Sequence, residues 1–427
     1  MPLPPRLRRR IAAALPALLA VFIAACSNAD YPNSVFTRFT EFNRDVGYLF
    51  DVLIYLGTFV FVFVEGILLY TIFKYRRKSE NDRPKHVHGN TTLEILWTAI
   101  PALILAFIAV PTVRTIFKTQ ATASADALQV QVIGHQWWWE FKYPQYGITT
   151  ANELYLPIGR KANFALTTYD VLHSFSIPQL GGKRDLISNR TNYLWFTPDS
   201  TGEQAWNGFC AEFCGASHAN MHFKVFTVSP GNFESWAANQ QKMAAYGAIA
   251  PAAASVVPVA APGAAAAPSS VAAAVPAAAP AAVPVSFVSF PHDKMPAHII
   301  PQTPLPEGLA FNESLTGDPQ RGLDFMTKMG GGCVGCHMIN GNPVMMGVIG
   351  PNLTHIGSRS TIAGGLYPND TRHLTRWIKN ARWMKPGVLM PTLGAGEYDP
   401  MMKNNIPKTG LNDQQIADIV AYLQALK

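Results

Sequence analysis

Residues 210–221 read CAEFCGASHANM, and this stretch combines two cysteines with a histidine and a methionine. The two cysteines stand four residues apart, and a further histidine lies upstream in the segment DVLHSFSIP. Thiolates, imidazoles and a thioether together suit copper, which accepts soft sulfur and borderline nitrogen in one site. Two thiolates on one short loop can bridge a pair of copper ions, whereas a mononuclear blue-copper centre needs only one. The stretch therefore favours a dicopper site with His173, Cys210, Cys214, His218 and Met221 as candidate ligands.

Two other interpretations use the same residue types. Cys210 and Cys214 can form a disulfide in an oxidising compartment, and a zinc site can be built from cysteine and histidine. Neither explains why a methionine and a distant histidine accompany the cysteine pair. On these residues alone, all three interpretations stay open.

A second cofactor motif, CVGCH, occupies residues 333–337 and is typical of covalent haem c attachment. It predicts two thioether bonds, from Cys333 and Cys336, and an iron ligand, His337. Met390, in the loop GVLMP, is the candidate distal ligand, and Met384 is its competitor. The segments GPNLTHIGSR and NDQQIADIVAYLQALK follow the motif, so that residues 307–427 resemble a class I cytochrome c. His355 and His373 are interpreted as packing or surface residues.

The chain has 427 residues, of which 48% are apolar and only 14% charged, a composition that indicates membrane segments. Two spans are expected, over about residues 47–74 and 93–117, within a hairpin over 27–120. The loop between them is rich in lysine and arginine, which predicts that it stays cytoplasmic and that both soluble ends face the periplasm. Residues 1–26 resemble a signal peptide that ends in a lipoprotein box, with Cys26 as the lipidated residue. Despite the net charge of +7, no nucleic-acid-binding motif is visible.

Short alternating segments between residues 126 and 230 predict β-strands, which suggests a Greek-key sandwich. We expect a cupredoxin-like domain over residues 121–245 that presents the copper ligands on its loops. Residues 246–306 are rich in alanine and proline in their first part and are predicted to be a linker to the cytochrome c domain. The predicted fold is therefore a multidomain membrane protein with a two-helix transmembrane hairpin, an all-β domain and an all-α domain.

These motifs, in this order, resemble subunit II of a caa3-type cytochrome c oxidase. The resemblance implies that the two cysteines bridge the coppers, that each histidine binds one copper, and that Met221 and the Glu212 carbonyl are axial ligands. It also implies that the Glu212 carboxylate faces a magnesium ion shared with subunit I. In GHQWWW, Trp137 would be the electron-entry residue, with Trp138 and Trp139 more suited to packing. Glu94 would be a candidate entry point of a proton pathway.

The resemblance implies an electron-entry subunit that passes electrons from haem c to copper and on to subunit I, where oxygen is reduced and protons are translocated. Expected partners are subunits I and III, membrane lipid, and a cytochrome bc complex or soluble cytochrome c as donor. Quinol oxidase subunits share the spans and the β-domain but lack copper ligands. A nitric oxide reductase component with a similar copper loop, and a lipoprotein scaffold with a zinc module, are the remaining alternatives. The role of Glu65, inside the first span, is not assigned.

Overall fold

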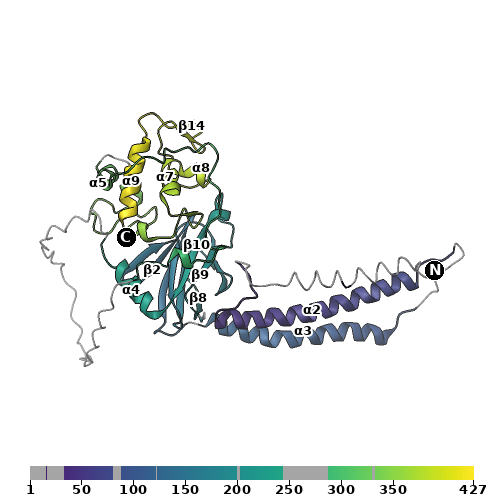
Figure 1. Ribbon diagram of the computed structural model, residues 1–427. Coiled ribbons are helices and arrows are strands. Elements are labelled where there is room, and N and C mark those ends of the chain that lie inside the picture. The colour runs from purple at the N-terminus through teal and green to yellow at the C-terminus, as the bar shows by residue number, and fades with distance from the viewer. Residues whose placement is uncertain are drawn as a thin grey trace, which may run out of the picture.

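The computed structural model describes residues 33–79, 88–121, 123–199, 202–243, 287–328 and 332–427, together with Pro16. A long helical hairpin projects from one end of a β-sandwich, and a group of short helices lies at the opposite end of the sandwich (Figure 1). Apart from Pro16, the predicted signal peptide with Cys26 lies outside the described residues, as do the middle of the basic loop and residues 246–286 of the predicted linker.

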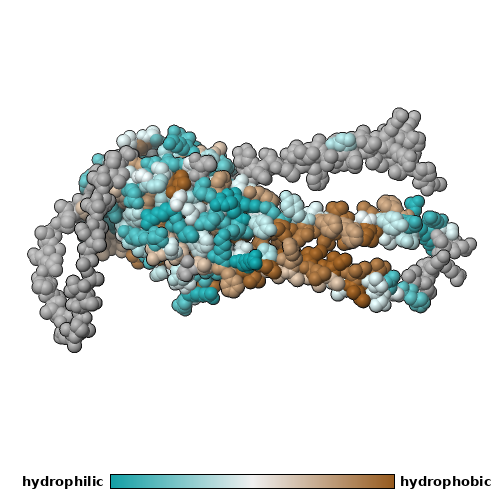
Figure 2. Space-filling model, turned by 90° about the horizontal axis from the view of Figure 1, so that it is seen from below, coloured by the Kyte–Doolittle hydropathy of each residue, from teal (hydrophilic) through white to brown (hydrophobic). Residues whose placement is uncertain are grey.

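Helices α2 (Glu41–Lys74) and α3 (Thr91–Gln120) form the hairpin. Their first turns are capped by the side chains of Thr40, which accepts one backbone N–H, and Asn90, which accepts two. Helices of 34 and 30 residues are long enough to cross about 30 Å of hydrocarbon at 1.5 Å per residue. Figure 2 shows apolar side chains covering the middle of the hairpin, with hydrophilic ones towards its tip. The two predicted spans are therefore confirmed as apolar helices of spanning length.

Both helices join the β-sandwich at the same end, which fixes the hairpin against it. The hydroxyl of Thr40, the N-cap of α2, donates to the carbonyl of Leu180. Near the end of α3, Lys118 pairs with Asp45 of α2 at 2.6 Å. The last turn of α2 and the first turn of α3 therefore lie at the far end of the hairpin, away from the soluble part of the chain (Figure 1).

The sandwich consists of two five-stranded sheets that enclose one apolar core. The first sheet has the order β3-β2-β1-β5-β8 and contains β1 (Leu128–His135), β2 (Trp138–Tyr143), β3 (Ile148–Ala151), β5 (Ala162–Thr168) and β8 (Asn192–Phe196). The second has the order β4-β10-β9-β6-β7 and contains β4 (Glu153–Pro157), β6 (His173–Ile177), β7 (Gly182–Leu186), β9 (Gln204–Cys210) and β10 (His222–Val228). Alternate residues of β2 are fully buried, as expected for a strand with one face on a core. The predicted β-sandwich is confirmed.

Two further segments cover the second sheet. Helix α4 (Pro230–Gln240) packs Trp236 against Tyr155, with ring centroids 4.5 Å apart. Residues 287–300, which contain the one-turn helix η2 (His292–Lys294), place Phe290 on Phe226 at 5.1 Å. Lys224 binds this segment through a 2.6 Å hydrogen bond to the carbonyl of Ile299. The second part of the predicted linker is thus attached to the sandwich.

The C-terminal domain is built around two crossing helices. It contains α5 (Pro319–Thr327), α6 (Cys333–Cys336), α7 (Thr371–Lys379), α8 (Ala381–Met384) and α9 (Asp413–Ala425), the turn η3 (Ile356–Ser358), and the short pairs β11 (Thr361–Ile362) with β12 (Tyr367–Pro368) and β13 (Tyr398–Asp399) with β14 (Asn404–Asn405). Helix α5 meets α9 at Gly322, where an added Cβ would lie 2.1 Å from the carbonyl oxygen of Asp418. This close approach requires glycine, and it holds the first helix beside the last, as in the predicted cytochrome c fold.

Candidate copper and haem sites

The loop after β9 brings the sulfur and nitrogen atoms of the predicted copper ligands together. The Sγ atoms of Cys210 and Cys214 are 3.8 Å apart. Nδ1 of His173 lies 3.8 Å from the first sulfur, and Nδ1 of His218 lies 3.6 Å from the second. The thioether of Met221 lies 3.8 Å from Cys214 Sγ. Ligands held at about 2.3 Å in a tetrahedral arrangement are about 3.8 Å from one another, so this spacing fits atoms that share metal ions.

The same loop provides a backbone acceptor. The backbone carbonyl oxygen of Glu212 lies 3.2 Å from the sulfur of Cys210. The side-chain carboxylate of Glu212 accepts a hydrogen bond from the N–H of Phe213. The hydrogen bond between the two thiols is the main cause that lowers the pKa of Cys210, which favours a thiolate at one member of the pair. A pair of sulfurs with two imidazoles, a thioether and a carbonyl suits copper better than zinc, which rarely takes a thioether.

Asp170 orients the buried imidazole of His173. Its carboxylate lies 2.8 Å from His173 Nε2 and also accepts a 2.7 Å hydrogen bond from the N–H of Gln136. Burial alone would lower the pKa of His173, but the hydrogen bonds to Asp170 and Cys210 raise it overall. A carboxylate behind a ligating imidazole fixes the ring orientation and increases its basicity. His173 opens strand β6, and Asp170 lies three residues earlier, a local spacing that could have marked it from the sequence.

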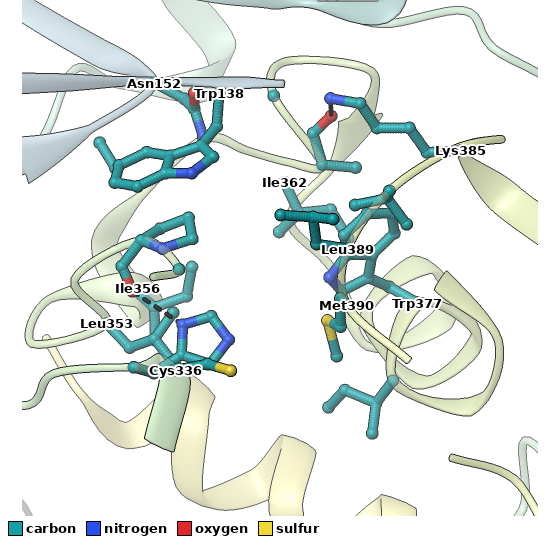
Figure 3. Close-up of a pocket in the computed structure, with 18 of the residues that line it drawn as sticks. Trp138, Asn152, Cys336, Leu353, Ile356, Ile362, Trp377, Lys385, Leu389 and Met390 are labelled. Atoms are coloured by element: carbon teal, nitrogen blue, oxygen red, sulfur yellow. Dashed lines mark hydrogen bonds between the residues drawn. The ribbon is translucent and has the colours of Figure 1, made fainter. Parts of the chain in front are cut away.

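A cavity of about 280 Å³ contains the predicted haem-binding residues Cys333, Cys336, His337 and Met390 on its wall. Figure 3 shows Cys336 and the sulfur of Met390 on opposite sides of the cavity. Nδ1 of His337 lies 2.8 Å from the carbonyl of Pro351, which leaves Nε2 for an iron ion. Burial lowers the pKa of His337 and so keeps the ring neutral, the form that binds iron. These residues fit a covalently attached haem with histidine and methionine ligands.

Gly350 shows how closely the chain wraps the proximal imidazole. A Cβ atom at this position would lie 2.6 Å from Cε1 of His337, so that a larger residue would displace the ring. Met384, the competing distal candidate, is buried elsewhere, and its carbonyl accepts a 3.0 Å hydrogen bond from Tyr367. It is not part of the cavity wall, whereas Met390 is.

The β-sandwich forms one end of this haem cavity. Trp138 and Asn152 close that end from strand β2 and the turn after β3, as Figure 3 shows. Trp137 also lines the cavity, and its indole Nε1 donates a 3.0 Å hydrogen bond to the carbonyl of Cys214 in the copper loop. Trp137 thus lies between the two sites. Trp139 is fully buried in the sandwich core, as predicted, but Trp138 has a second role on the cavity wall that its position in the sequence did not indicate.

The remaining predicted positions lie outside both sites. Glu94 is exposed in the first turn of α3, at the tip of the hairpin, and Glu65 lies within α2. His355 is buried where its Nε2 lies 3.2 Å from the carbonyl of Lys242. His373 lies in the first turn of α7, and its Nδ1 is 2.8 Å from the carboxylate of the N-cap residue Asp370. The packing interpretation of both histidines agrees with these contacts.

Comparisons with known proteins match three parts of the chain. Residues 40–115 match the transmembrane domain of cytochrome c oxidase subunit II, residues 147–228 its periplasmic domain, and residues 321–427 cytochrome c. Cytochrome c oxidase subunit 2 of a Bacillus species is 31% identical over 83% of this chain and 80% of its own length. The chain belongs to the cytochrome c oxidase subunit 2 family. The subunit 2 of Alkalihalophilus pseudofirmus is 29% identical over 86% of this chain and 83% of its own length.

A solved structure, the periplasmic domain of subunit II of cytochrome oxidase from Bradyrhizobium japonicum, is 29% identical over 28% of this chain and 97% of its own length, with a TM-score of 0.27. As a cytochrome c oxidase subunit 2 with a fused C-terminal cytochrome c domain, the chain is the electron-entry subunit of a haem-copper oxidase. Its domains imply copper and haem c as cofactors, and its hairpin anchors it in the membrane. It associates with oxidase subunit I and receives electrons from a cytochrome c donor.

Replacing Asp170 with alanine should weaken copper binding by about 10- to 100-fold, because His173 loses the carboxylate that orients it. Copper retention by the full-length protein against a competing chelator measures this effect. Asp185→Ala is the matched control, since Asp185 lies on β7 opposite Ser174 and is not among the ligand contacts. Equal retention in the two variants would show that Asp170 does not support the ligand.

Proposed function

We propose that electrons enter at haem c, pass through the Trp137 region to a dinuclear copper centre, and leave for subunit I. The observation that carries this proposal is the position of Trp137, which lines the haem cavity and binds the copper loop through its indole. Haem iron and copper each supply reversible one-electron chemistry when bound. The chain's own residues hold both groups in a largely buried setting, where little rearrangement accompanies a change of charge.

In this proposal Cys210 and Cys214 bridge two copper ions, and each ion takes one imidazole, from His173 or His218. Met221 and the carbonyl of Glu212 complete the two shells. The distances among these atoms, between 3.2 and 3.8 Å, support the assignment. The Glu212 carboxylate is half-exposed beside this loop, which supports a role as ligand to a magnesium ion shared with subunit I.

Haem c is assigned to Cys333 and Cys336 as thioether residues, with His337 and Met390 as axial ligands. Trp137 is proposed as the electron-transfer residue between the two centres, and Glu94 as a candidate entry point for protons. Lys74 ends α2, and Arg76, Arg77 and Lys78 follow it at the tip of the hairpin, which supports a cytoplasmic tip and periplasmic soluble domains. Subunit III, membrane lipid and lipidation of Cys26 belong to the same proposal, as do domain boundaries near residues 120, 245 and 306.

Replacing Cys214 with serine should abolish the dinuclear centre, because one bridging thiolate is lost while Cys210 remains. Electron paramagnetic resonance of the copper-loaded full-length protein should change from a pattern of two equivalent coppers to a single-copper pattern or none. Ser217→Ala, at a buried position of the same loop, serves as a control that keeps every ligand. Two coupled coppers in the serine variant would disprove the bridging role.

Replacing Met390 with alanine should leave haem covalently attached but lower its reduction potential by on the order of 0.1 V. A fall of this size lies within the range of reduction potentials that different axial ligands produce. Potentiometric titration of the haem absorbance measures the change. Met384→Ala is the control, since Met384 does not line the cavity. A fall in the control but not in the Met390 variant would reassign the distal ligand.

A further inference from the structure

Two cationic side chains lie at the end of the haem cavity where the β-sandwich and the cytochrome c domain meet. Lys385 is 1% exposed and Arg359 is 9% exposed, and both line the cavity. Neither forms an ion pair with a carboxylate in the part of the chain that the structure describes. Arg359 has the carboxylate of Glu153 as a nearby countercharge, but Lys385 has no carboxylate partner there. A buried cation without a counterion is unfavourable, so Lys385 favours an anionic group at this end of the cavity.

Lys385 connects the two domains directly. Its ammonium group donates to the carbonyl of Trp137 in the sandwich at 2.7 Å and to the carbonyl of Ala363 in its own domain at 3.0 Å. An ammonium group has three donors, so two carbonyls leave one donor for a further acceptor. Figure 3 shows Lys385 on the cavity wall, on the same side as Met390 and towards the end that Trp138 and Asn152 close.

Reciprocal contacts from the sandwich hold this arrangement in place. Glu153 of β4 is 2% exposed and accepts hydrogen bonds from the N–H groups of Ser360 and Thr361 at 2.7 and 3.2 Å. Its charge also acts favourably on Arg359. The backbone N–H of His222 in β10 donates to the backbone carbonyl of Gly364 at 3.1 Å. Each domain therefore donates to and accepts from the other across a buried interface.

We propose that Lys385 binds a carboxylate of haem c and, through the Trp137 carbonyl, holds the haem in a fixed position relative to the copper domain. Haem carries two propionate side chains, and the attachment of its other edge to Cys333 and Cys336 leaves these carboxylates for the cationic end of the cavity. Lys385 is then a positioning residue with three acceptors: one in each domain and one on the haem. Burial lowers the pKa of Lys385 to about 7, and a carboxylate partner would restore its charge. This inference rests on the proposed haem site.

The test uses Lys385→Met and Lys385→Arg in the full-length membrane protein, with the reduction potential of haem c as the readout. Loss of the cation should lower the potential, because a nearby positive charge favours the reduced iron. The arginine variant should stay near the wild-type value. Lys379→Met is the matched control, since Lys379 is a largely buried lysine of the same domain that pairs with Asp413 and does not line the cavity.

A potential in Lys385→Met equal to that of the Lys379→Met control would overturn the inference, as would an equal fall in Lys385→Arg. Lys385→Gln, which keeps a polar group without the charge, replaces the methionine variant if that protein does not accumulate. Haem staining after denaturing electrophoresis distinguishes a failure of the haem site from a failure of the role of Lys385. Wild-type protein without covalent haem contradicts the proposed haem site itself, whereas attached haem with an unchanged potential contradicts only the role of Lys385.

Discussion

Two hydrogen bonds fix Trp137 between the copper loop and the haem cavity. Its indole donates to the Cys214 carbonyl at 3.0 Å, and its own carbonyl accepts from Lys385 at 2.7 Å. One residue thus contacts the backbone of a copper ligand and a buried cation of the cytochrome c domain. Because electron transfer depends steeply on separation, a path that runs through fixed, buried contacts suits transfer between two centres better than a mobile encounter does.

The buried interface also changes the role of the alanine- and proline-rich segment. A linker alone would keep the cytochrome c domain nearby at a high effective concentration. Here the chain attaches to the sandwich again at residues 287–300, and Glu153 and Lys385 then join the two domains through buried polar contacts. Such contacts are specific in direction, since each buried donor needs its acceptor in place. The domains are therefore held in one orientation by chemistry that a tether cannot supply.

Much of this organisation could be predicted from the sequence because its signals are local. Cys210 to Met221 and the CVGCH motif carry most of their ligands within a few residues, and the two spans are continuous apolar segments. The contacts that join the domains could not be predicted in this way. Lys385 and Trp137 are 248 residues apart, and Glu153 and Ser360 are 207 apart, so no sequence spacing relates them. Likewise, Trp138 resembled an ordinary strand aromatic until the fold placed it on the haem cavity wall.

The most direct test of the docked arrangement is time-resolved electron transfer in the full-length protein loaded with haem and copper. A light pulse with a soluble photoreductant reduces haem c, and the absorbance of haem and copper is then followed together. Docking predicts that haem oxidation and copper reduction share one first-order rate that does not change with protein concentration. A rate proportional to protein concentration, or reduced haem that never passes its electron to copper, would contradict it.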